Sequence, residues 1–329
     1  MIERIAKAYL KSKEQQKKVD EILLPGHWKN LIQKKQDILK PLIENKEYAN
    51  IEKLLETFLQ NKELIEGFSE SFNIGMFTSE YERWKIFDVG DIEDAEVPKI
   101  GKPHYFTVGT YISDDNKKLV LNPIHTNIYS LRFHKLANTV ANLLKQIDGH
   151  PIIAELGPGY GGITYYLMKK TNRKMTYILY DLPETNVISS YYLTKLFPKK
   201  TFLFYGEDNE RPLTDYDIII LPNFELQKLE NEYIDLFISI RTLGESMNLD
   251  SVDFYTTEIM RILKIGGYFL HERCNNAPDD YMKKFDRRLT MLYETRALFH
   301  NTCNYEYLFK KRVHPPAPVL VSILVPSYQ

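Results

Sequence analysis

The sequence contains little cysteine and no excess of charge of either sign. Cys274 and Cys303 are the two cysteines in 329 residues. Because their spacing is not that of metal ligands, a disulfide framework or a structural zinc site is disfavoured, and we expect reduced thiols in a cytoplasmic protein. Lysine and arginine together number 43 and aspartate and glutamate 44, so no net field attracts nucleic acid or an anionic membrane.

Long apolar runs are also missing. Charged residues interrupt the apolar ones every few positions in the first 21 residues, which suits neither a signal-peptide core nor a spanning helix, and no later stretch reaches membrane-spanning length. Apolar residues nevertheless make up 43% of the chain, which is enough to build a packed core. We expect a folded protein that is not inserted in a membrane and has no nucleic-acid partner.

Residues 1 to about 70 are rich in Lys, Glu, Leu and Ile, and their apolar positions recur at helical spacing. The pattern predicts several amphipathic helices, with breaks at Pro25 and Pro41 because proline cannot continue a helix interior. Two interpretations stay open for this region: a cap without chemistry, or a surface through which the chain forms a homodimer. Residues 72–127 mix aromatic side chains with Gly, Pro and Asp and predict a connector without a helical period.

A helix is predicted over residues 129–147, and from residue 150 onward strand and helix patterns alternate. The predicted strands are 152–156, 176–181, 201–205, 217–221, 236–240 and 268–272, and the predicted helices are 162–170, 185–196 and 252–263. Helical crossovers between strands build a parallel sheet with helices on both faces. Residues 305–310 and 319–324 are predicted to form an antiparallel pair that closes the sheet. The fold class is α/β, with a helical region and connector at 1–110 and a second domain at 111–329.

The sharpest local signal is the buried strand 152–156, which leads directly into the glycine-rich turn 157–161, Gly-Pro-Gly-Tyr-Gly. Glycine is needed where the backbone turns sharply and a ligand must approach without a Cβ in the way. The next strand ends in Asp181, where α/β nucleotide binders place an acid that accepts hydrogen bonds from ribose hydroxyls. The alternative is a tight turn beside a surface aspartate.

Two cofactor classes compete for this turn. Gly157, Gly159 and Gly162 satisfy the G-x-G-x-x-G spacing of nicotinamide dinucleotide sites, so the glycines do not decide. Glu155 distinguishes the two cofactor classes. A carboxylate at this position would repel a pyrophosphate, whereas it suits the cationic amino-acid part and the sulfonium of S-adenosylmethionine. We therefore expect S-adenosylmethionine as the cofactor.

Residues 150–275 resemble class I S-adenosylmethionine-dependent methyltransferases, and within them the sugar O-methyltransferase family of bacterial surface-polysaccharide clusters. The resemblance is carried by E-L-G-P-G-Y-G-G, Y-D-L-P-E-T, Y-G-E-D, L-P-N-F-E-L, D-L-F-I-S-I-R-T-L-G-E-S-M and I-L-K-I-G-G-Y-F-L-H-E-R. It implies a Rossmann-like methyltransferase sheet and a role in polysaccharide biosynthesis. The family often has Glu-Met where this chain has Glu245-Ser246-Met247, so the register of Glu245 departs from the pattern.

The resemblance also implies the cofactor contacts. The methionine part is expected at Glu155, Gly157, Pro158, Gly159, Tyr160 and Gly161, the ribose at Asp181 and Leu182, and the adenine at Asn223 and Phe224.

Methyl transfer from a sulfonium is an in-line displacement, and a sugar hydroxyl needs a base that removes its proton as the bond forms. Strand ends that line the crevice nominate Arg241, Glu245, His271 and Glu272. His271 is the preferred base, oriented by Glu272 or Glu245, although a strand-end histidine can equally be a satisfied polar residue. Arg241 is a candidate for holding a phosphate or carboxylate of the acceptor, or forms an ordinary ion pair.

The leading hypothesis is an O-methyltransferase that acts on a sugar or nucleotide sugar. The spacing of the histidines matches no metal site, so no metal is predicted. A NAD-dependent oxidoreductase and a catalytically silent binding protein are the two alternatives.

Overall fold

The computed structural model of the chain describes these residues: 1–19, 26–65, 73–87, 90–109, 111–113, 119–121, 123–207, 211–244, 249–273, 282, 285, 287–297 and 305–313. Cys274, Cys303, Glu245 and the strand predicted at 319–324 lie outside them.

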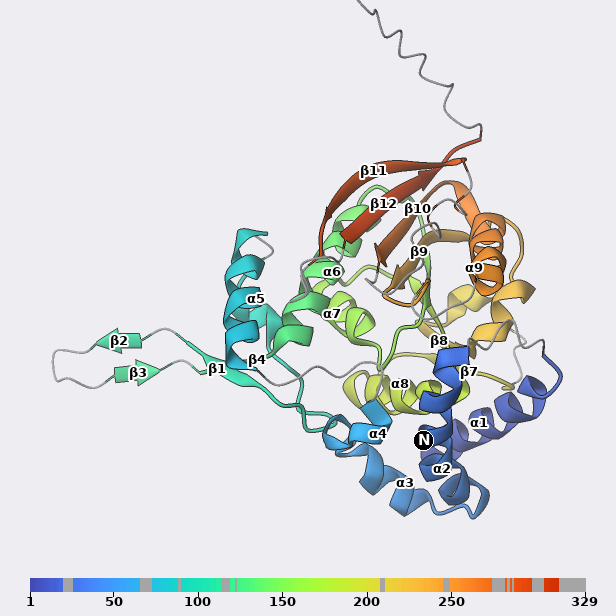
Figure 1. Cartoon of the computed structure of the whole chain (residues 1–329), viewed down its shortest axis with the longest axis horizontal. Helices are drawn as coiled ribbons and strands as arrows, with labels where there is room; N and C mark the ends of the chain where they lie inside the picture. Colours follow the sequence, from blue (N-terminus) through green and yellow to red (C-terminus); the bar gives the residue numbers. More distant parts are fainter. Residues whose placement is uncertain are drawn as a thin grey trace, which may run out of the picture.

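Within the described chain, the centre of the molecule is an eight-stranded sheet with the order β11-β12-β10-β9-β5-β6-β8-β7. The strands from β10 to β7 run parallel, whereas β12 is antiparallel to both β10 and β11 (Figure 1). This confirms the α/β class with a mostly parallel sheet and an antiparallel C-terminal strand. The strands are β5 (Ile152–Leu156), β6 (Thr176–Asp181), β7 (Phe202–Phe204), β8 (Ile218–Pro222), β9 (Ile234–Ile240), β10 (Leu263–Arg273), β11 (Leu289–Arg296) and β12 (Tyr305–Lys311).

Helices cover both faces of the sheet because its strands are apolar on both sides. Successive residues of a strand face opposite layers. Ile153 therefore packs in one apolar cluster and Ala154 in the other, as a two-sided parallel sheet requires. The first cluster draws side chains from α6 (Ile128–Leu144), α7 (Gly162–Lys170) and α8 (Pro183–Leu196), and the second from α9 (Leu249–Ile262).

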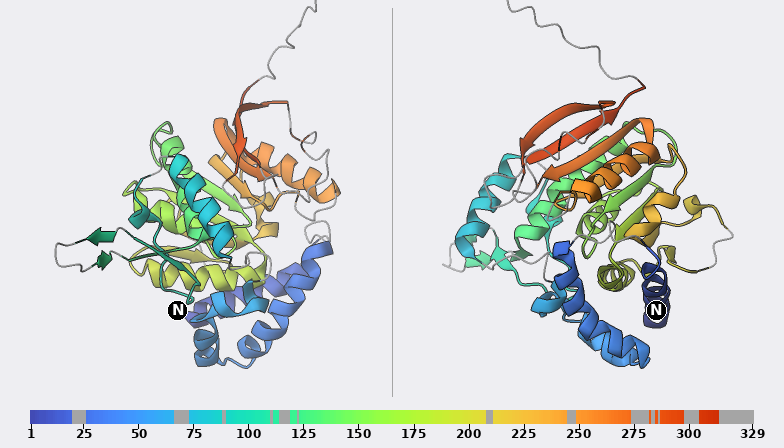
Figure 2. Two further views of the ribbon diagram at one scale, coloured as in Figure 1. Left: turned by 60° about the vertical axis from the view of Figure 1, so that its left-hand side comes forward. Right: turned by 45° about the vertical axis from the view of Figure 1, so that its right-hand side comes forward.

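The N-terminal region is helical, as the sequence predicted, and it packs beside α8 (Figure 2). Ile5, Leu39 and Phe58 belong to the same apolar cluster as Ile188 of α8. Lys13 also forms an ion pair with the fully buried Glu184 at 2.8 Å. The region thus shares its core with the sheet. Its elements are α1 (Ile2–Gln16), α2 (Gly26–Glu44), α3 (Tyr48–Leu55), the 3-10 turn η2 (Phe58–Gln60) and α4 (Lys62–Ile65).

The break predicted at Pro41 is wrong, because Pro41 lies inside α2. A proline removes the hydrogen bond to the carbonyl four residues earlier. Here that loss falls in the last turn of the helix, and Asn45 still donates its backbone N–H to the Pro41 carbonyl at 3.0 Å.

The prediction of a connector without a helix at 72–127 is also wrong in part. The segment contains α5 (Ile74–Ile86), whose first turn is capped by the Asn73 side chain, which accepts from Met76 N at 3.1 Å. Phe77 and Trp84 of α5 pack with Leu131 of α6 in a small apolar cluster, so the aromatic residues serve a helix–helix contact. The rest of the segment forms η3 (Ile92–Ala95), the antiparallel pair β1 (Phe106–Val108) with β4 (Ile124–Thr126), and the pair β2 (Tyr111–Ser113) with β3 (Leu119–Leu121), which projects from the body in Figure 1.

At the C-terminal end, the strand predicted at 305–310 is present as β12. Its partners in the described chain are β10 and β11, and β11 was not predicted. β11 lies at the edge of the sheet, where Met291 and Leu292 stay about half exposed. None of the residues of β11 is fully buried, so its sequence lacks the alternation of apolar and polar residues that marks a half-buried strand, and the strand was not predicted.

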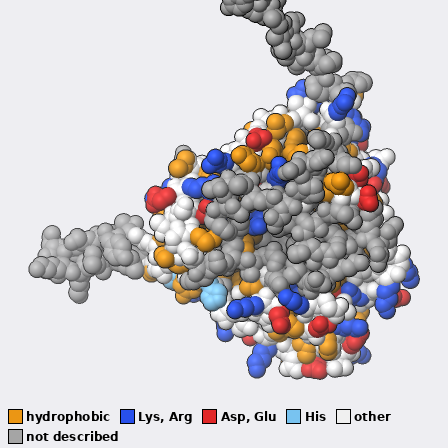
Figure 3. Space-filling model, viewed as in Figure 1, with side chains coloured by type: hydrophobic (Ala, Val, Ile, Leu, Met, Phe, Trp, Pro, Cys, Tyr) orange, Lys and Arg blue, Asp and Glu red, His pale blue; other side chains and the backbone are white. Residues whose placement is uncertain are grey.

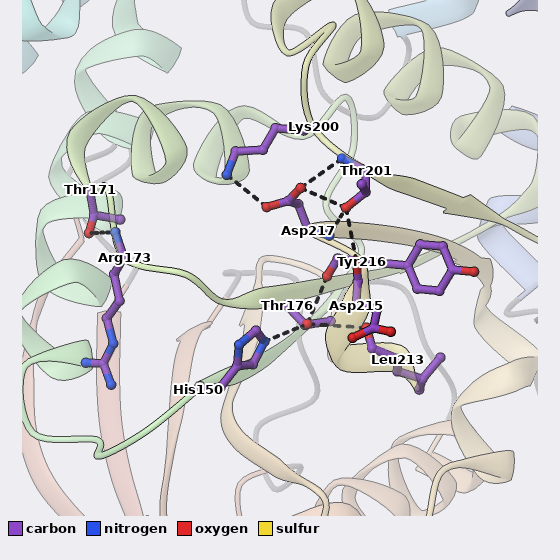
Figure 4. A network of polar contacts seen from close by, with 10 residues as sticks. All are labelled: His150, Thr171, Arg173, Thr176, Lys200, Thr201, Leu213, Asp215, Tyr216 and Asp217. Carbon is purple, nitrogen blue, oxygen red and sulfur yellow. Dashed lines mark hydrogen bonds and ion pairs between the residues drawn. The ribbon is translucent and has the colours of Figure 1, made fainter. Parts of the chain in front are cut away.

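Polar contacts fasten the sheet at the edge where β6 and β8 begin (Figure 4). Thr176 donates to the Tyr216 carbonyl at 2.9 Å and lies 2.9 Å from His150 Nε2. Asp217 accepts from the Thr201 backbone N–H at 2.8 Å and forms an ion pair with Lys200 at 2.9 Å. These contacts join neighbouring segments at the amino ends of the strands, opposite the edge at which an α/β sheet binds its ligand.

Positive and negative side chains are interspersed over the N-terminal helices in the space-filling view (Figure 3). Exposed pairs include Glu3 with Lys7 at 2.8 Å and Glu52 with Lys195 at 2.6 Å. Among the described helices, none is long and apolar enough to cross a membrane.

Candidate functional site

The turn between β5 and α7 can be built only with glycine at its key positions. Gly157, Gly159 and Gly161 have φ angles of 73°, 59° and 90°, in the left-handed region that residues with a Cβ rarely adopt. A Cβ on Gly157 would lie 2.0 Å from Thr242 Oγ1. Gly157 N also donates to the Tyr180 carbonyl of β6 at 2.8 Å, which draws the turn over the carboxyl ends of β5 and β6.

A cavity lies beside this turn at the carboxyl ends of the strands. It contains about 980 Å³ that no protein atom fills, some of it open to solvent. Its walls come from α2, α6, the glycine turn, the ends of β6 and β9, and α9. The lining residues are Lys35, Tyr129, Arg132, Phe133, Glu155, Leu156, Gly157, Pro158, Gly159, Tyr160, Ile163, Tyr180, Asp181, Leu182, Thr185, Asn223, Ile240, Arg241, Thr242 and Tyr255.

Asp181 connects the turn to the end of β6. Its carboxylate accepts from Gly159 N at 3.1 Å and from Leu182 N at 2.7 Å. Burial raises the pKa of Asp181 to about 6. These hydrogen bonds and the charge of Lys35 act in the opposite direction and lower the pKa. The group is therefore ionised near neutral pH and can accept from the hydroxyls of a ligand.

Glu155 is the second carboxylate of the cavity and is 2% exposed. Tyr177 of the neighbouring strand donates its hydroxyl to Glu155 Oε2 at 2.7 Å. Burial raises the pKa of Glu155 to about 7, and the bond from Tyr177 opposes the rise. A buried acid of this kind favours a positively charged partner, because such a partner stabilises its ionised form.

The structure brings most of the predicted cofactor residues to one cavity. Glu155, Gly157, Pro158, Gly159, Tyr160, Asp181, Leu182 and Asn223 all line it. Gly161 does not line the cavity and is the N-cap residue of α7. Phe224 does not line the cavity: it is 2% exposed and packs edge-on against Tyr205 with the ring centres 5.9 Å apart. Asn223 is held by its own bond, from Nδ2 to the Tyr255 hydroxyl at 2.8 Å.

The predicted catalytic residues do not lie together in the structure. Arg241 lines the cavity directly after β9, whereas Glu245 lies outside the described residues. His271 and Glu272 are neighbours on β10, so their side chains point to opposite faces of the sheet.

The structure corrects the prediction of His271 as the preferred base. Its side chain is fully buried in the layer that contains Phe269, with Nδ1 3.0 Å from the Ser239 carbonyl, and it does not line the cavity. Burial lowers the pKa of His271 to about 4, so it remains neutral and structural at neutral pH. Glu272, predicted to orient it, points the other way and accepts from Arg132 Nη2 at 2.9 Å.

The sequence did not predict several cavity residues. Lys35 is one lysine in a lysine-rich helix and reaches the cavity only because α2 packs beside α8. Tyr129, Arg132 and Phe133 come from α6, which precedes the first parallel strand. No local pattern distinguishes them, because α6 also buries other polar residues, such as His134, Lys135 and Asn138.

The comparisons with known proteins give fold-level similarity. No family model matches the sequence, and the search of curated proteins gives no match. Among solved structures, the chain is similar to the N-methyltransferase NodS from Bradyrhizobium japonicum in complex with S-adenosyl-L-homocysteine (11% identity, 54% of this chain and 87% of that chain covered, TM-score 0.40).

It is also similar to a TehB-like SAM-dependent methyltransferase from Corynebacterium glutamicum (17% identity, 56% and 96% covered, TM-score 0.38). A third similar structure is phosphoethanolamine N-methyltransferase 1 from Haemonchus contortus (11% identity, 58% and 47% covered, TM-score 0.39).

Proposed function

We propose that the protein is a methyltransferase that uses S-adenosylmethionine. The observation that carries the proposal is the placement of two carboxylates, the buried Glu155 and the partly buried Asp181, beside the glycine turn in one cavity. The cofactor carries a sulfonium and an ammonium group, which a carboxylate at the end of β5 attracts, and ribose hydroxyls, which can donate to Asp181 at the end of β6. The residues present therefore suit this cofactor.

A nicotinamide dinucleotide fits the same residues less well. Its pyrophosphate would approach the glycine turn next to Glu155, and two negative groups in a buried site repel each other. A catalytically silent binding protein would keep the cavity, so only an activity measurement separates it from the enzyme.

The chemistry proposed is an in-line displacement on the methyl carbon. The bond between the cofactor sulfur and the methyl carbon breaks as a bond from the acceptor oxygen forms, the sulfur keeps the electron pair, and the hydroxyl proton passes to a base. The protein contributes chiefly by holding acceptor and cofactor in line, which is worth about 7–11 kcal/mol in ideal intramolecular systems. Glu245 stays a predicted catalytic residue, nominated to orient the base, and lies outside the described residues.

We further propose a sugar or nucleotide-sugar hydroxyl as the acceptor, in a cytoplasmic step of surface-polysaccharide synthesis. The support for it is the resemblance of residues 150–275. The division near residue 110 and a homodimer formed through the N-terminal helices remain predictions.

Ligand binding tests the cofactor assignment. S-adenosylhomocysteine should raise the melting temperature in a concentration-dependent way, and NAD should not. Asp181→Asn should reduce the shift at a given ligand concentration, while Asp250→Asn, which removes an exposed carboxylate elsewhere, should keep it. Stabilisation by NAD and not by S-adenosylhomocysteine would reverse the assignment. Transfer of a labelled methyl group to a panel of nucleotide sugars then tests the acceptor, and loss of transfer with retained binding would favour the silent protein.

A further inference from the structure

The wall of the cavity formed by α6 and the end of β9 carries two guanidinium groups. Arg132 lies on α6 and Arg241 follows β9, and both line the cavity. The two acids of the cavity, Glu155 and Asp181, come from β5 and β6 and are proposed to face the cofactor. The arginines are therefore placed where the second substrate would meet the cofactor.

Arg241 has an unusual backbone conformation. Its φ is 55°, a left-handed conformation that is unfavourable for a residue with a long side chain. Lys46, Lys102 and Glu232 share a positive φ among the described residues, but they do not line the cavity. The Arg241 N–H donates to the Glu272 carbonyl at 3.0 Å, which fixes the conformation. Strained conformations of this kind cluster at functional sites.

Glu272 lies close to both arginines. Its carboxylate accepts from Arg132 Nη2 at 2.9 Å, and the charges of Arg132 and Arg241 both oppose the burial that raises its pKa. It is 1% exposed. This contact orients the Arg132 guanidinium and makes Glu272 a positioning residue.

Other acids near Glu272 and Arg132 are paired with bases of their own. Glu80 also acts on Arg132, but it is paired with Arg83 at 2.7 Å. On the neighbouring strand, Glu306 is paired with Lys135 at 2.5 Å. The charge of Arg132 also acts on Glu155, the buried acid of the cavity.

We propose that the methyl acceptor carries an oxyanion, a phosphate or a carboxylate, and that Arg132 and Arg241 bind it. The inference rests on the proposed function. The planar fork of a guanidinium binds two oxygens of such a group at once. An anionic acceptor is attracted both by the two guanidinium groups and by the cationic cofactor. Tyr129 and Phe133 line the same side and supply apolar faces for the rest of the molecule.

The test is calorimetric binding to the full chain saturated with S-adenosylhomocysteine. The probes are UDP-glucose, glucuronate and glucose, which present a diphosphate, a carboxylate and no charge. We expect at least one anionic probe to bind more than tenfold more tightly than glucose, and the better of the two identifies phosphate or carboxylate as the recognised group.

Arginine variants connect the binding to the site. Arg241→Gln should weaken the anionic probe at least tenfold and leave S-adenosylhomocysteine affinity within about threefold. Arg241→Lys should be intermediate, because it keeps the charge and loses the fork. Arg132→Lys is the second variant, since it keeps a cation beside buried Glu272. Arg211→Gln removes an exposed arginine away from the cavity and should behave as the unaltered protein.

The outcomes separate the two proposals. If the unaltered protein does not bind S-adenosylhomocysteine, the proposed function fails and this inference with it. If it binds S-adenosylhomocysteine but glucose binds as well as the anionic probes, or neither anionic probe binds, the inference alone is overturned. It is equally overturned if Arg241→Gln and Arg132→Lys both bind S-adenosylhomocysteine and retain full affinity for the anionic probe.

Discussion

Protonation of Glu155 is expected to control how tightly the protein binds its cofactor. Burial raises the pKa of this carboxyl from 4.5 to about 7 in the folded chain. The cationic part of the cofactor favours the ionised form. Affinity for S-adenosylhomocysteine, which keeps the ammonium group, should therefore fall as the pH drops through 7. About one eleventh of the groups are ionised one pH unit below the pKa and ten elevenths one unit above it, so the Kd should be about tenfold higher at pH 6 than at pH 8.

The stability of the cofactor-free protein should change in the opposite direction. A carboxyl whose pKa is raised in the folded state contributes stability that is fully present below its unfolded pKa of 4.5 and is lost as the pH rises through about 7. At about 1.4 kcal/mol per pH unit, the loss is about 3 kcal/mol. Neighbouring groups also titrate: Asp181, with a pKa raised to about 6, adds to the loss of affinity below pH 6.

Glu155→Gln isolates the effect, because the amide keeps the shape of the side chain and can still accept from Tyr177. Without cofactor, the variant should be about 3 kcal/mol more stable than the unaltered protein at pH 8 and nearly equal at pH 5, as measured by urea unfolding at each pH. Its affinity for S-adenosylhomocysteine should vary little between pH 6.5 and pH 8. Tyr177→Phe removes the bond that lowers the pKa, so its affinity midpoint should move to higher pH.

Two results would refute this reasoning. One is a Kd for S-adenosylhomocysteine that stays constant from pH 6 to pH 8 in the unaltered protein. The other is a Glu155→Gln variant that keeps the same pH dependence as the unaltered protein, since the titrating group would then lie elsewhere.

Three further substitutions test the site and its surroundings. Asp181→Asn should weaken S-adenosylhomocysteine binding by about 10- to 100-fold in calorimetry, because a hydrogen bond to a charged group is worth about 1.5–3 kcal/mol. Gly157→Ala should lower the melting temperature and abolish binding, since its Cβ would meet Thr242 at 2.0 Å and φ is 73°; retained binding would contradict the proposed turn geometry. His271→Asn should cost about 1–3 kcal/mol of unfolding free energy but leave cofactor affinity within about threefold, and loss of binding would contradict its structural role.

The sequence predicted the parallel sheet and the cofactor side of the cavity because both depend on local patterns. The apolar strand 152–156 and the glycines after it specify a strand and a turn by backbone sterics alone. Asp181 was predictable for a similar reason, since a carboxylate at the end of the second strand must meet that turn at the same edge of the sheet.

The acceptor side was not predictable, because it depends on packing between distant segments. Arg132 and Arg241 are 109 positions apart in the sequence and meet at the cavity only through the sheet and α6. The prediction that His271 faces the cavity was wrong because neighbouring residues of a strand point to opposite faces of the sheet. A strand end can present either neighbour to a crevice, and here β10 turns His271 into the core and Glu272 toward Arg132.

The N-terminal helices contribute to the chemistry of the site as well as to the core. Lys35 of α2 is 3% exposed, lines the cavity and lowers the pKa of Asp181. Without a cation nearby, burial would hold more of this carboxyl protonated near neutral pH, and a protonated acid is a poorer acceptor for ribose hydroxyls. The cation comes from a helix that is held in place by apolar side chains such as Leu39 and Ile43, packed in the same cluster as the sheet. A region that the sequence indicated as a cap or a dimer surface therefore helps to keep the proposed ribose acid ionised.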